Sequence, residues 1–121
     1  MAFDPVDRLV AYHAAIDALD FPAIAAMFAE DAVYESGGLG GVVEGRDAIM
    51  AGFRRYFDLY PDQVSTDSIV ERLDESRARS VWNLVATNRL TKDVLRRAGE
   101  EIVAFAATGH ILRVEIRDHA P

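Results

Sequence analysis

The chain contains no cysteine. This absence excludes disulfides, thiolate metal ligands and cysteine nucleophiles, and it is typical of proteins from a reducing compartment. Basic residues are also few, since 13 Lys and Arg stand against 20 Asp and Glu and give a net charge of −7. An acidic surface repels phosphate backbones, so we expect no nucleic-acid partner.

Long apolar runs are lacking as well. No run approaches the roughly 20 residues that a membrane span needs, and the first ten residues carry acids where a secretory signal would be apolar. We therefore expect a cytoplasmic protein with no membrane partner, and the Ala-, Arg- and Asp-rich composition is typical of a bacterial source. Three scattered histidines without cysteine indicate no metal cluster. The GGLGG stretch lacks the order and context of a dinucleotide-binding loop, so no cofactor is predicted.

The chain does have 121 residues, half of them hydrophobic, which suit a single domain over residues 1–121 with its own core. Its first half favours helices. Asp4 and Pro5 can start the first helix, and Asp20 can cap a second over Ala23–Ala29. A third is predicted over residues 46–60, where apolar residues repeat at helical spacing: Ile49, Met50, Phe53 and Phe57.

Two strand pairs are predicted outside the helices. Asp31–Ser36 pairs with Val42–Gly45 across the glycine-rich turn, and residues 63–73 pair with residues 77–90 as a long hairpin. The segment 91–101 fits either a loop or a continued strand.

The end of the chain carries a further pairing signal. Apolar residues change parity at Thr108-Gly109, so we predict a two-residue turn there, in which Phe105 faces Leu112 and Val103 faces Val114. Helices followed by hairpins are typical of an α+β fold. We predict three N-terminal helices packed in a strongly curved antiparallel sheet that forms a cone-shaped pocket.

Three stretches resemble a known family: LDFPAI between the first two helices, MFAEDAVY leading into the first strand, and GRDAI opening the third helix. Over roughly Asp4–Tyr60 the chain resembles the SnoaL-like branch of the nuclear transport factor 2-like superfamily, and the rest matches by pattern. The resemblance implies a small-molecule pocket that serves a cofactor-free isomerase, cyclase or dehydratase, or else a non-catalytic binding or dimerisation domain. It also implies a homodimer formed through the sheet.

The catalytic sets of the superfamily are incomplete in this sequence. The isomerase tyrosine corresponds to Tyr12, but Ser36 stands at the position of the catalytic aspartate. The epoxide-hydrolase arginine corresponds to Arg89, but Thr91 stands where the acid belongs. Asp17 matches the dehydratase aspartate without the expected histidines on the sheet. The resemblance therefore implies a fold and a pocket rather than a reaction.

His13 and Asp17 are the clearest catalytic candidates because they lie one turn apart on one flank of the first helix. A carboxylate there can orient the imidazole and raise its basicity, which makes His13 a candidate general base. Tyr12 or Tyr34 can polarise a carbonyl, and strand alternation turns Tyr34 inward. Equally, His13 can be a core residue satisfied by a backbone carbonyl, with Asp17 in solvent.

Candidate ligand contacts come mainly from aromatic side chains, which suit a flat apolar molecule. Trp82 shares a strand face with Asn88 and can stack on such a ligand, although such aromatics more often serve core packing or a dimer interface. The expected partner is a small apolar or cyclic molecule in the cone. The candidate contacts are Phe28, Phe53, Phe57, Trp82, Asn88, Phe105 and His110.

Overall fold

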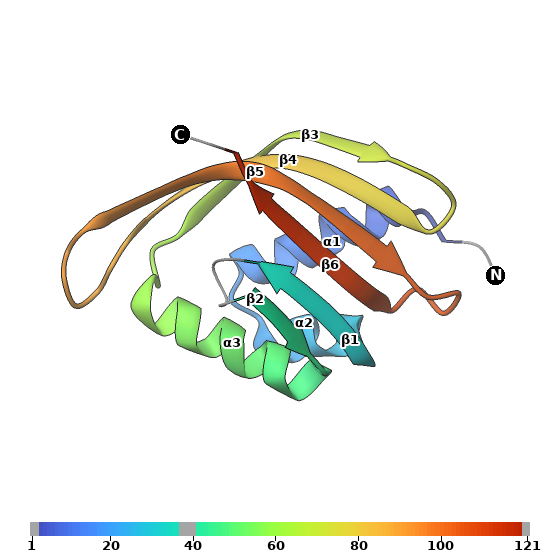
Figure 1. Cartoon of the computed structure of the whole chain (residues 1–121), viewed down its shortest axis with the longest axis horizontal. Helices are drawn as coiled ribbons and strands as arrows, with labels where there is room; N and C mark the ends of the chain where they lie inside the picture. Colours follow the sequence, from blue (N-terminus) through green and yellow to red (C-terminus); the bar gives the residue numbers. More distant parts are fainter. Residues whose placement is uncertain (1–2, 37–40, 120–121) are drawn as a thin grey trace.

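The computed structural model describes residues 3–36 and 41–119, which form three helices and one six-stranded sheet. The predicted α+β fold class is confirmed. Figure 1 shows the long strands arching over the helices, so that the helices lie on one concave side of the sheet. Most of the predicted glycine-rich turn lies outside the described residues.

The residues predicted to cap the first two helices, Asp4 and Asp20, do cap them. In α1 (Pro5–Asp17) the side chain of Asp4 accepts a hydrogen bond from the Val6 N–H at 2.8 Å. In α2 (Phe21–Met27) Asp20 accepts from the Ala23 N–H at 3.2 Å. This helix starts two residues earlier than predicted, because Phe21 and Pro22 form its first turn directly after the Asp20 cap. It also ends two residues earlier, because the backbone is already extended at Phe28.

The third helix, α3 (Arg46–Leu59), buries the predicted apolar face against the sheet. Ile49, Met50, Phe53 and Phe57 are all buried. Phe53 stacks on Phe57 and meets the edge of Tyr34 from β1, so the helix brings aromatic rings to the concave side of the sheet.

The strand order in the sheet is β2-β1-β6-β5-β4-β3. Pairing is antiparallel except between β1 and β6, which run parallel, in a sheet that we predicted to be antiparallel throughout. The last strand fills the place between β1 and β5, and a connection through most of the chain allows this parallel arrangement. The strands are β1 (Phe28–Ser36), β2 (Gly41–Glu44), β3 (Val64–Arg72), β4 (Arg77–Thr87), β5 (Val94–Phe105) and β6 (Ile111–Asp118).

The two hairpins among the last four strands form as predicted, with one change of register. The open segment 91–101 belongs mostly to β5, which begins at Val94. Val103 pairs with Val114, but Phe105 pairs with Ile111, and Leu112 is exposed. The predicted two-residue turn is wrong, because the connection is longer and the Ala106 N–H bonds the His110 carbonyl at 2.8 Å.

Candidate functional site

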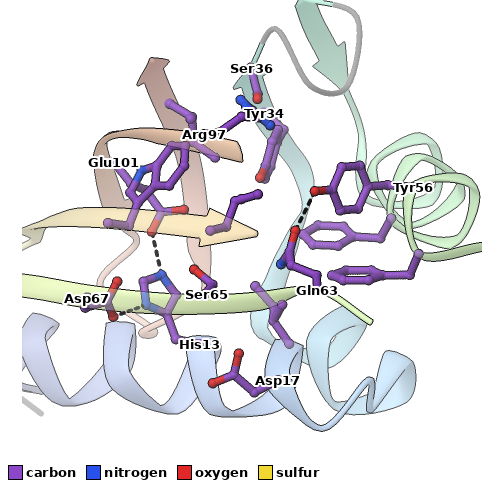
Figure 2. Close-up of a pocket in the computed structure, with 16 residues that line it drawn as sticks. His13, Asp17, Tyr34, Ser36, Tyr56, Gln63, Ser65, Asp67, Arg97 and Glu101 are labelled. Carbon is purple, nitrogen blue, oxygen red and sulfur yellow. Dashed lines mark hydrogen bonds and ion pairs between the residues drawn. The ribbon is translucent and has the colours of Figure 1, made fainter. Parts of the chain in front are cut away.

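A pocket of about 120 Å³ lies between α1, α3 and the concave face of the sheet. Figure 2 shows its polar side chains arriving from α1, α3 and several strands. Aromatic rings supply much of its wall, and these come from Tyr34, Phe53, Tyr56, Phe57 and Trp82. A cavity of comparable size in another protein holds one benzene ring, so this pocket suits a small cyclic molecule.

The central polar feature of the pocket is His13, whose two ring nitrogens each meet a carboxylate. Nδ1 lies 2.6 Å from Oδ2 of Asp67 on β3, and Nε2 lies 2.6 Å from Oε1 of Glu101 on β5. His13 is on the inward face of α1 with Leu9, Tyr12 and Ile16, at the spacing that faces the sheet. The three side chains connect three elements that are far apart in sequence.

Both contacts are sheltered from solvent, since the exposed side-chain fractions are 21% for His13, 23% for Asp67 and 6% for Glu101. Burial alone lowers the pKa of His13, but hydrogen bonds to Asp67 and Glu101 outweigh it and raise the pKa to about 10. At neutral pH the ring is therefore an imidazolium held between two carboxylates. It can donate a proton, whereas it cannot accept one.

The pair predicted between His13 and Asp17 does not form. Both ring nitrogens of His13 are taken by Asp67 and Glu101, while Asp17 is exposed at the end of α1, where it lines the pocket. His13 and Asp17 lie on one flank of α1, but the carboxylates that reach the imidazole come from Asp67 and Glu101 of the sheet. The raised pKa of His13 makes its ring suited to donating a proton, whereas the sequence predicted a general base.

Two tyrosines lie beside the carboxylate of Glu101. Burial raises the pKa of Tyr12 well above its usual value, and proximity to Tyr34 and Glu101 raises it further. Burial likewise raises the pKa of Tyr34, with Glu101 adding to the effect. Both phenols therefore stay neutral donors. Tyr34 lines the pocket, whereas Tyr12 is fully buried behind it, with its hydroxyl interacting with that of Tyr34.

Arg97 occupies the opposite side of the pocket. Its Nε and Nη2 donate to the two carboxylate oxygens of Asp118 at 2.7 and 2.6 Å, and its guanidinium lies 5.5 Å from the centre of the Trp82 ring. The side-chain hydrogen bonds to Asp118 raise the pKa of Arg97 despite partial burial. Two parallel hydrogen bonds to one carboxylate hold the planar guanidinium of Arg97 in a fixed orientation.

Gly99 makes room for the indole between these two polar groups. Trp82 pairs with Gly99 across β4 and β5. A Cβ on Gly99 would lie 3.0 Å from Cζ2 of Trp82 and 2.3 Å from the Arg117 carbonyl oxygen. Arg97, Gly99 and Glu101 share the inward parity of β5, so the missing side chain leaves the space that Trp82 fills.

The structure brings together six of the predicted site residues. His13, Asp17, Tyr34, Phe53, Phe57 and Trp82 all line the pocket. Phe28 and Tyr12 lie in the core behind the pocket. Phe105 packs against Phe3, and the two remaining predicted residues belong to turns.

Asn88 and His110 are these two turn residues. The amide oxygen of Asn88 accepts hydrogen bonds from the Leu90 and Thr91 N–H groups in the β4–β5 connection. His110 is exposed and contacts the Thr108 hydroxyl at 2.8 Å. Asn88 also donates from Nδ2 to the Tyr60 hydroxyl at 3.5 Å. These contacts within and beside the two loops explain both sequence positions without a ligand.

Asp67, Glu101 and Arg97 line the pocket but are not among the residues predicted from the sequence. A usable signal was present for the latter two, because Arg97 and Glu101 share their parity with the apolar Val103 and Phe105 of β5. Charged residues on the core face of a strand usually have a partner or a function. For Asp67 no such signal existed, since β3 is polar on both faces over Ser65–Ser68.

Within residues 3–36 and 41–119 no group of three His, Cys, Asp or Glu side chains is arranged to hold a metal ion. Over the same residues no helix is long and apolar enough to cross a membrane.

Comparisons with known proteins agree with this architecture. A family model described as a SnoaL-like domain matches residues 6–116. No curated protein matches the chain significantly. Among solved structures, RV0760c from Mycobacterium tuberculosis, in complex with estradiol-17β-hemisuccinate, superposes with a TM-score of 0.81 at 13% identity, covering 93% of this chain and 91% of that one.

Two further structures are similar in fold. SalBIII, an epoxide hydrolase/cyclase-like enzyme of pyran ring formation in salinomycin, gives a TM-score of 0.80 at 19% identity over 93% of this chain and 88% of its own. A polyketide cyclase-like protein from Xanthomonas campestris gives 0.76 at 21% identity over 91% and 86%. At these sequence identities the similarity establishes the fold, whereas the reaction has to be inferred from the residues of the pocket.

Proposed function

The chain belongs to the SnoaL-like domain family, and we propose that its pocket catalyses a cofactor-free proton transfer on a small, largely apolar cyclic molecule. The reaction is an isomerisation, a cyclisation or a dehydration. One observation carries the proposal: a protonated histidine held at 2.6 Å from each of two carboxylates inside an aromatic pocket. Titratable groups with strongly shifted pKa values in a pocket are typical of acid–base sites.

Glu101 is the proposed base. One of its oxygens holds His13, and Figure 2 shows the other turned toward the cavity. Its burial removes most competing water, which strengthens its interaction with a substrate proton. Asp67 lies at the outer side of His13 and keeps the imidazolium in place after Glu101 is neutralised.

His13 is the proposed acid. When Glu101 takes a proton from a carbon or hydroxyl of the substrate, it loses its negative charge and its hold on Nε2 of His13 weakens. The released Nε2–H can then give its proton to another carbon or to a leaving oxygen, while Nδ1–H stays bonded to Asp67. Substrate and product then have the same number of protons in an isomerisation or cyclisation, and a dehydration releases one water. The carboxyl proton of Glu101 returns to His13 across the 2.6 Å contact.

The tyrosines complete the proposed site. Tyr34 presents a neutral hydroxyl at the pocket wall and can donate a hydrogen bond to a substrate oxygen. Tyr12 is buried behind it and makes no contact with the cavity, so it acts as a positioning residue for Tyr34 and Glu101. The rings of Phe53, Phe57 and Trp82 hold the cyclic body of the substrate.

Deuterium exchange tests this proposal without knowledge of the natural substrate. A panel of small cyclic ketones, including indanone, is incubated in deuterium oxide with the protein, and loss of the α-proton signals is followed by NMR. The wild type should accelerate exchange, and Glu101→Gln should slow the catalysed exchange by a factor of about 10² to 10⁴.

The matched control for this variant is Glu100→Gln. Glu100 is the next residue on β5, faces the other side of the sheet and pairs with Arg79 at 2.9 Å. This variant should exchange ketones at the wild-type rate. Absence of catalysed exchange throughout the panel, or equal rates in wild type and Glu101→Gln, would contradict the proposal.

A second candidate function is binding of a small hydrophobic ligand without catalysis. It is favoured by the fact that the acid–base groups already satisfy one another. Two structural neighbours also support it, the estradiol-17β-hemisuccinate complex and a computationally designed 17-OHP binder. Binding of the ketone panel without exchange distinguishes this function from the first.

We also propose that two copies associate through the convex face of the sheet. Exposed apolar side chains lie on that face at Val64, Ile69 and Val94. Val64 and Val94 have the opposite parity to the pocket-lining residues of their strands, and the register shift between Asp67 and Ile69 turns Ile69 to the same outer face. A second copy could therefore cover all three without blocking the cavity.

A further inference from the structure

The pocket has a second polar end, which the proposed acid–base chemistry does not use. Arg97 lies four residues before Glu101 on the same face of β5, which separates their Cα atoms by about 13 Å along an extended strand. Both side chains line the one cavity, and Gly99 between them carries no side chain. A ligand in this cavity is therefore bounded by carboxylates at one end and by a guanidinium at the other.

Arg97 is held ready for a ligand by its other contacts. Asp118 engages Nε and Nη2, so Nη1 is the nitrogen that this ion pair does not use, and the guanidinium also interacts with the side chain of Tyr56. The stacking on Trp82 and a side-chain exposure of 15% fix the guanidinium against the pocket wall. A donor fixed in this way loses little conformational entropy when it binds an acceptor.

Gln63 and Tyr56 stand at the same end of the pocket. The Tyr56 hydroxyl donates to Oε1 of Gln63, which leaves the amide N–H groups of Gln63 as further donors into the cavity. Figure 2 shows this pair on the α3 side of the pocket, away from His13. The end of the pocket opposite the imidazolium is thus rich in donors and poor in free acceptors.

The charges decide which acceptor fits. At the His13 end, one imidazolium faces the carboxylates of Asp67 and Glu101, and at the other end Asp118 already neutralises Arg97. A pocket with this excess of carboxylates disfavours an anionic ligand. A neutral carbonyl oxygen avoids that repulsion and still accepts a charge-assisted hydrogen bond.

We propose that Arg97, with Gln63 beside it, binds the carbonyl oxygen of a neutral, flat cyclic ketone and thereby selects ketones over hydrocarbons of the same shape. This inference rests on the proposed function for the identity of the site. The acidic C–H then faces Glu101. When Glu101 takes that proton, the C–H electron pair forms a C=C bond and the carbonyl π pair moves to oxygen, where Arg97 stabilises the charge.

The test compares two probes of similar shape, indanone and indane, which differ in the carbonyl group. Their affinities are measured by ligand-observed NMR for the wild type, Arg97→Met and Arg96→Met. The wild type should prefer the ketone, and Arg97→Met should reduce that preference by about tenfold to a hundredfold. Arg96 is exposed on the opposite face of the same strand, so Arg96→Met should keep the wild-type preference.

Arg97→Lys provides a second variant should the methionine variant fail to fold. Lysine keeps the charge but cannot engage Asp118 through two parallel bonds and also offer a fixed donor, so the ketone preference should fall here too. Retention of the full preference in a folded Arg97 variant would overturn the inference. The same holds if His13→Gln abolishes the preference while Arg97→Met preserves it, because the oxygen then lies at the imidazolium.

Deuterium exchange of indanone in the same samples separates this inference from the proposed function. A ketone preference that depends on Arg97, without exchange by the wild type, supports the carbonyl contact and refutes proton transfer. Exchange by the wild type, with an unchanged preference in Arg97→Met, supports proton transfer and refutes the carbonyl contact.

Discussion

Replacing His13 by glutamine should destabilise the fold in a strongly pH-dependent way. His13 is the cation between Asp67 and Glu101, and it ties α1 to β3 and β5. Glutamine keeps hydrogen-bonding capacity but removes the charge, so two sheltered carboxylates lose their counter-ion. Removing one partner from a buried ion pair typically costs about 3–5 kcal/mol.

The pKa of His13 gives an independent magnitude. It is raised from 6.5 to about 10 in the folded protein, with burial opposing the shift and the hydrogen bonds to Asp67 and Glu101 producing it. At about 1.4 kcal/mol per pKa unit, this difference corresponds to about 5 kcal/mol of stability. This value agrees with the cost of about 3–5 kcal/mol for removing one partner of a buried ion pair.

The sign of the pH dependence follows from the raised pKa. The folded state holds the proton more tightly than the unfolded state, so the contribution is complete below pH 6.5. It declines as the pH rises from there and is lost above about pH 10. The free-energy difference between wild type and His13→Gln should therefore be largest near pH 6 and shrink toward pH 10.

Urea denaturation at a series of pH values measures this difference. His110→Gln is the matched control, because His110 is an exposed turn residue outside the pocket, and its stability should follow that of the wild type. The buried tyrosines affect wild type and variants alike, so they cancel in the comparison. A difference between wild type and His13→Gln that stays constant from pH 6 to pH 10 would refute the imidazolium assignment.

Two further predictions concern the sheet. Gly99→Ala should lower the free energy of unfolding by about 1–3 kcal/mol or more, because its Cβ meets the Arg117 carbonyl oxygen and the indole of Trp82. Thermal melts should show this loss, while Ala98→Ser, on the exposed face of the same strand, should stay within about 0.5 kcal/mol of the wild type. If two copies associate through the convex face, analytical ultracentrifugation should show a dimer at micromolar concentration. The double variant Val64→Lys with Val94→Lys should be a monomer under the same conditions. A monomeric wild type would contradict the proposed interface.

Much of the fold follows from local signals in the sequence. Asp4, Pro5 and Asp20 fix helix starts through capping and proline geometry, which act within a few residues. The apolar repeat of α3 determines which of its faces is buried, and alternation in β4 and β5 determines which residues point inward. Capping and periodicity are local signals, so they can be read without knowing which segments pack together in the fold.

The register of the strands and their relative directions were harder to predict from local sequence signals. The parallel contact of β6 with β1 joins segments separated by most of the chain, and no local pattern specifies it. The five-residue connection between β5 and β6 displaced Leu112 to the surface, because a bulge can absorb the parity change that suggested a two-residue turn.

By itself the sequence determined an α+β cone with an aromatic pocket, and it singled out His13 as a polar residue on the apolar face of its helix. Only the tertiary structure decided which groups His13 contacts. Asp67 is 54 residues away and Glu101 is 88 residues away, so their approach depends on how the sheet curves over α1. That approach turns a predicted base into an imidazolium, because a pKa reflects the charges around a group in space rather than its neighbours along the chain.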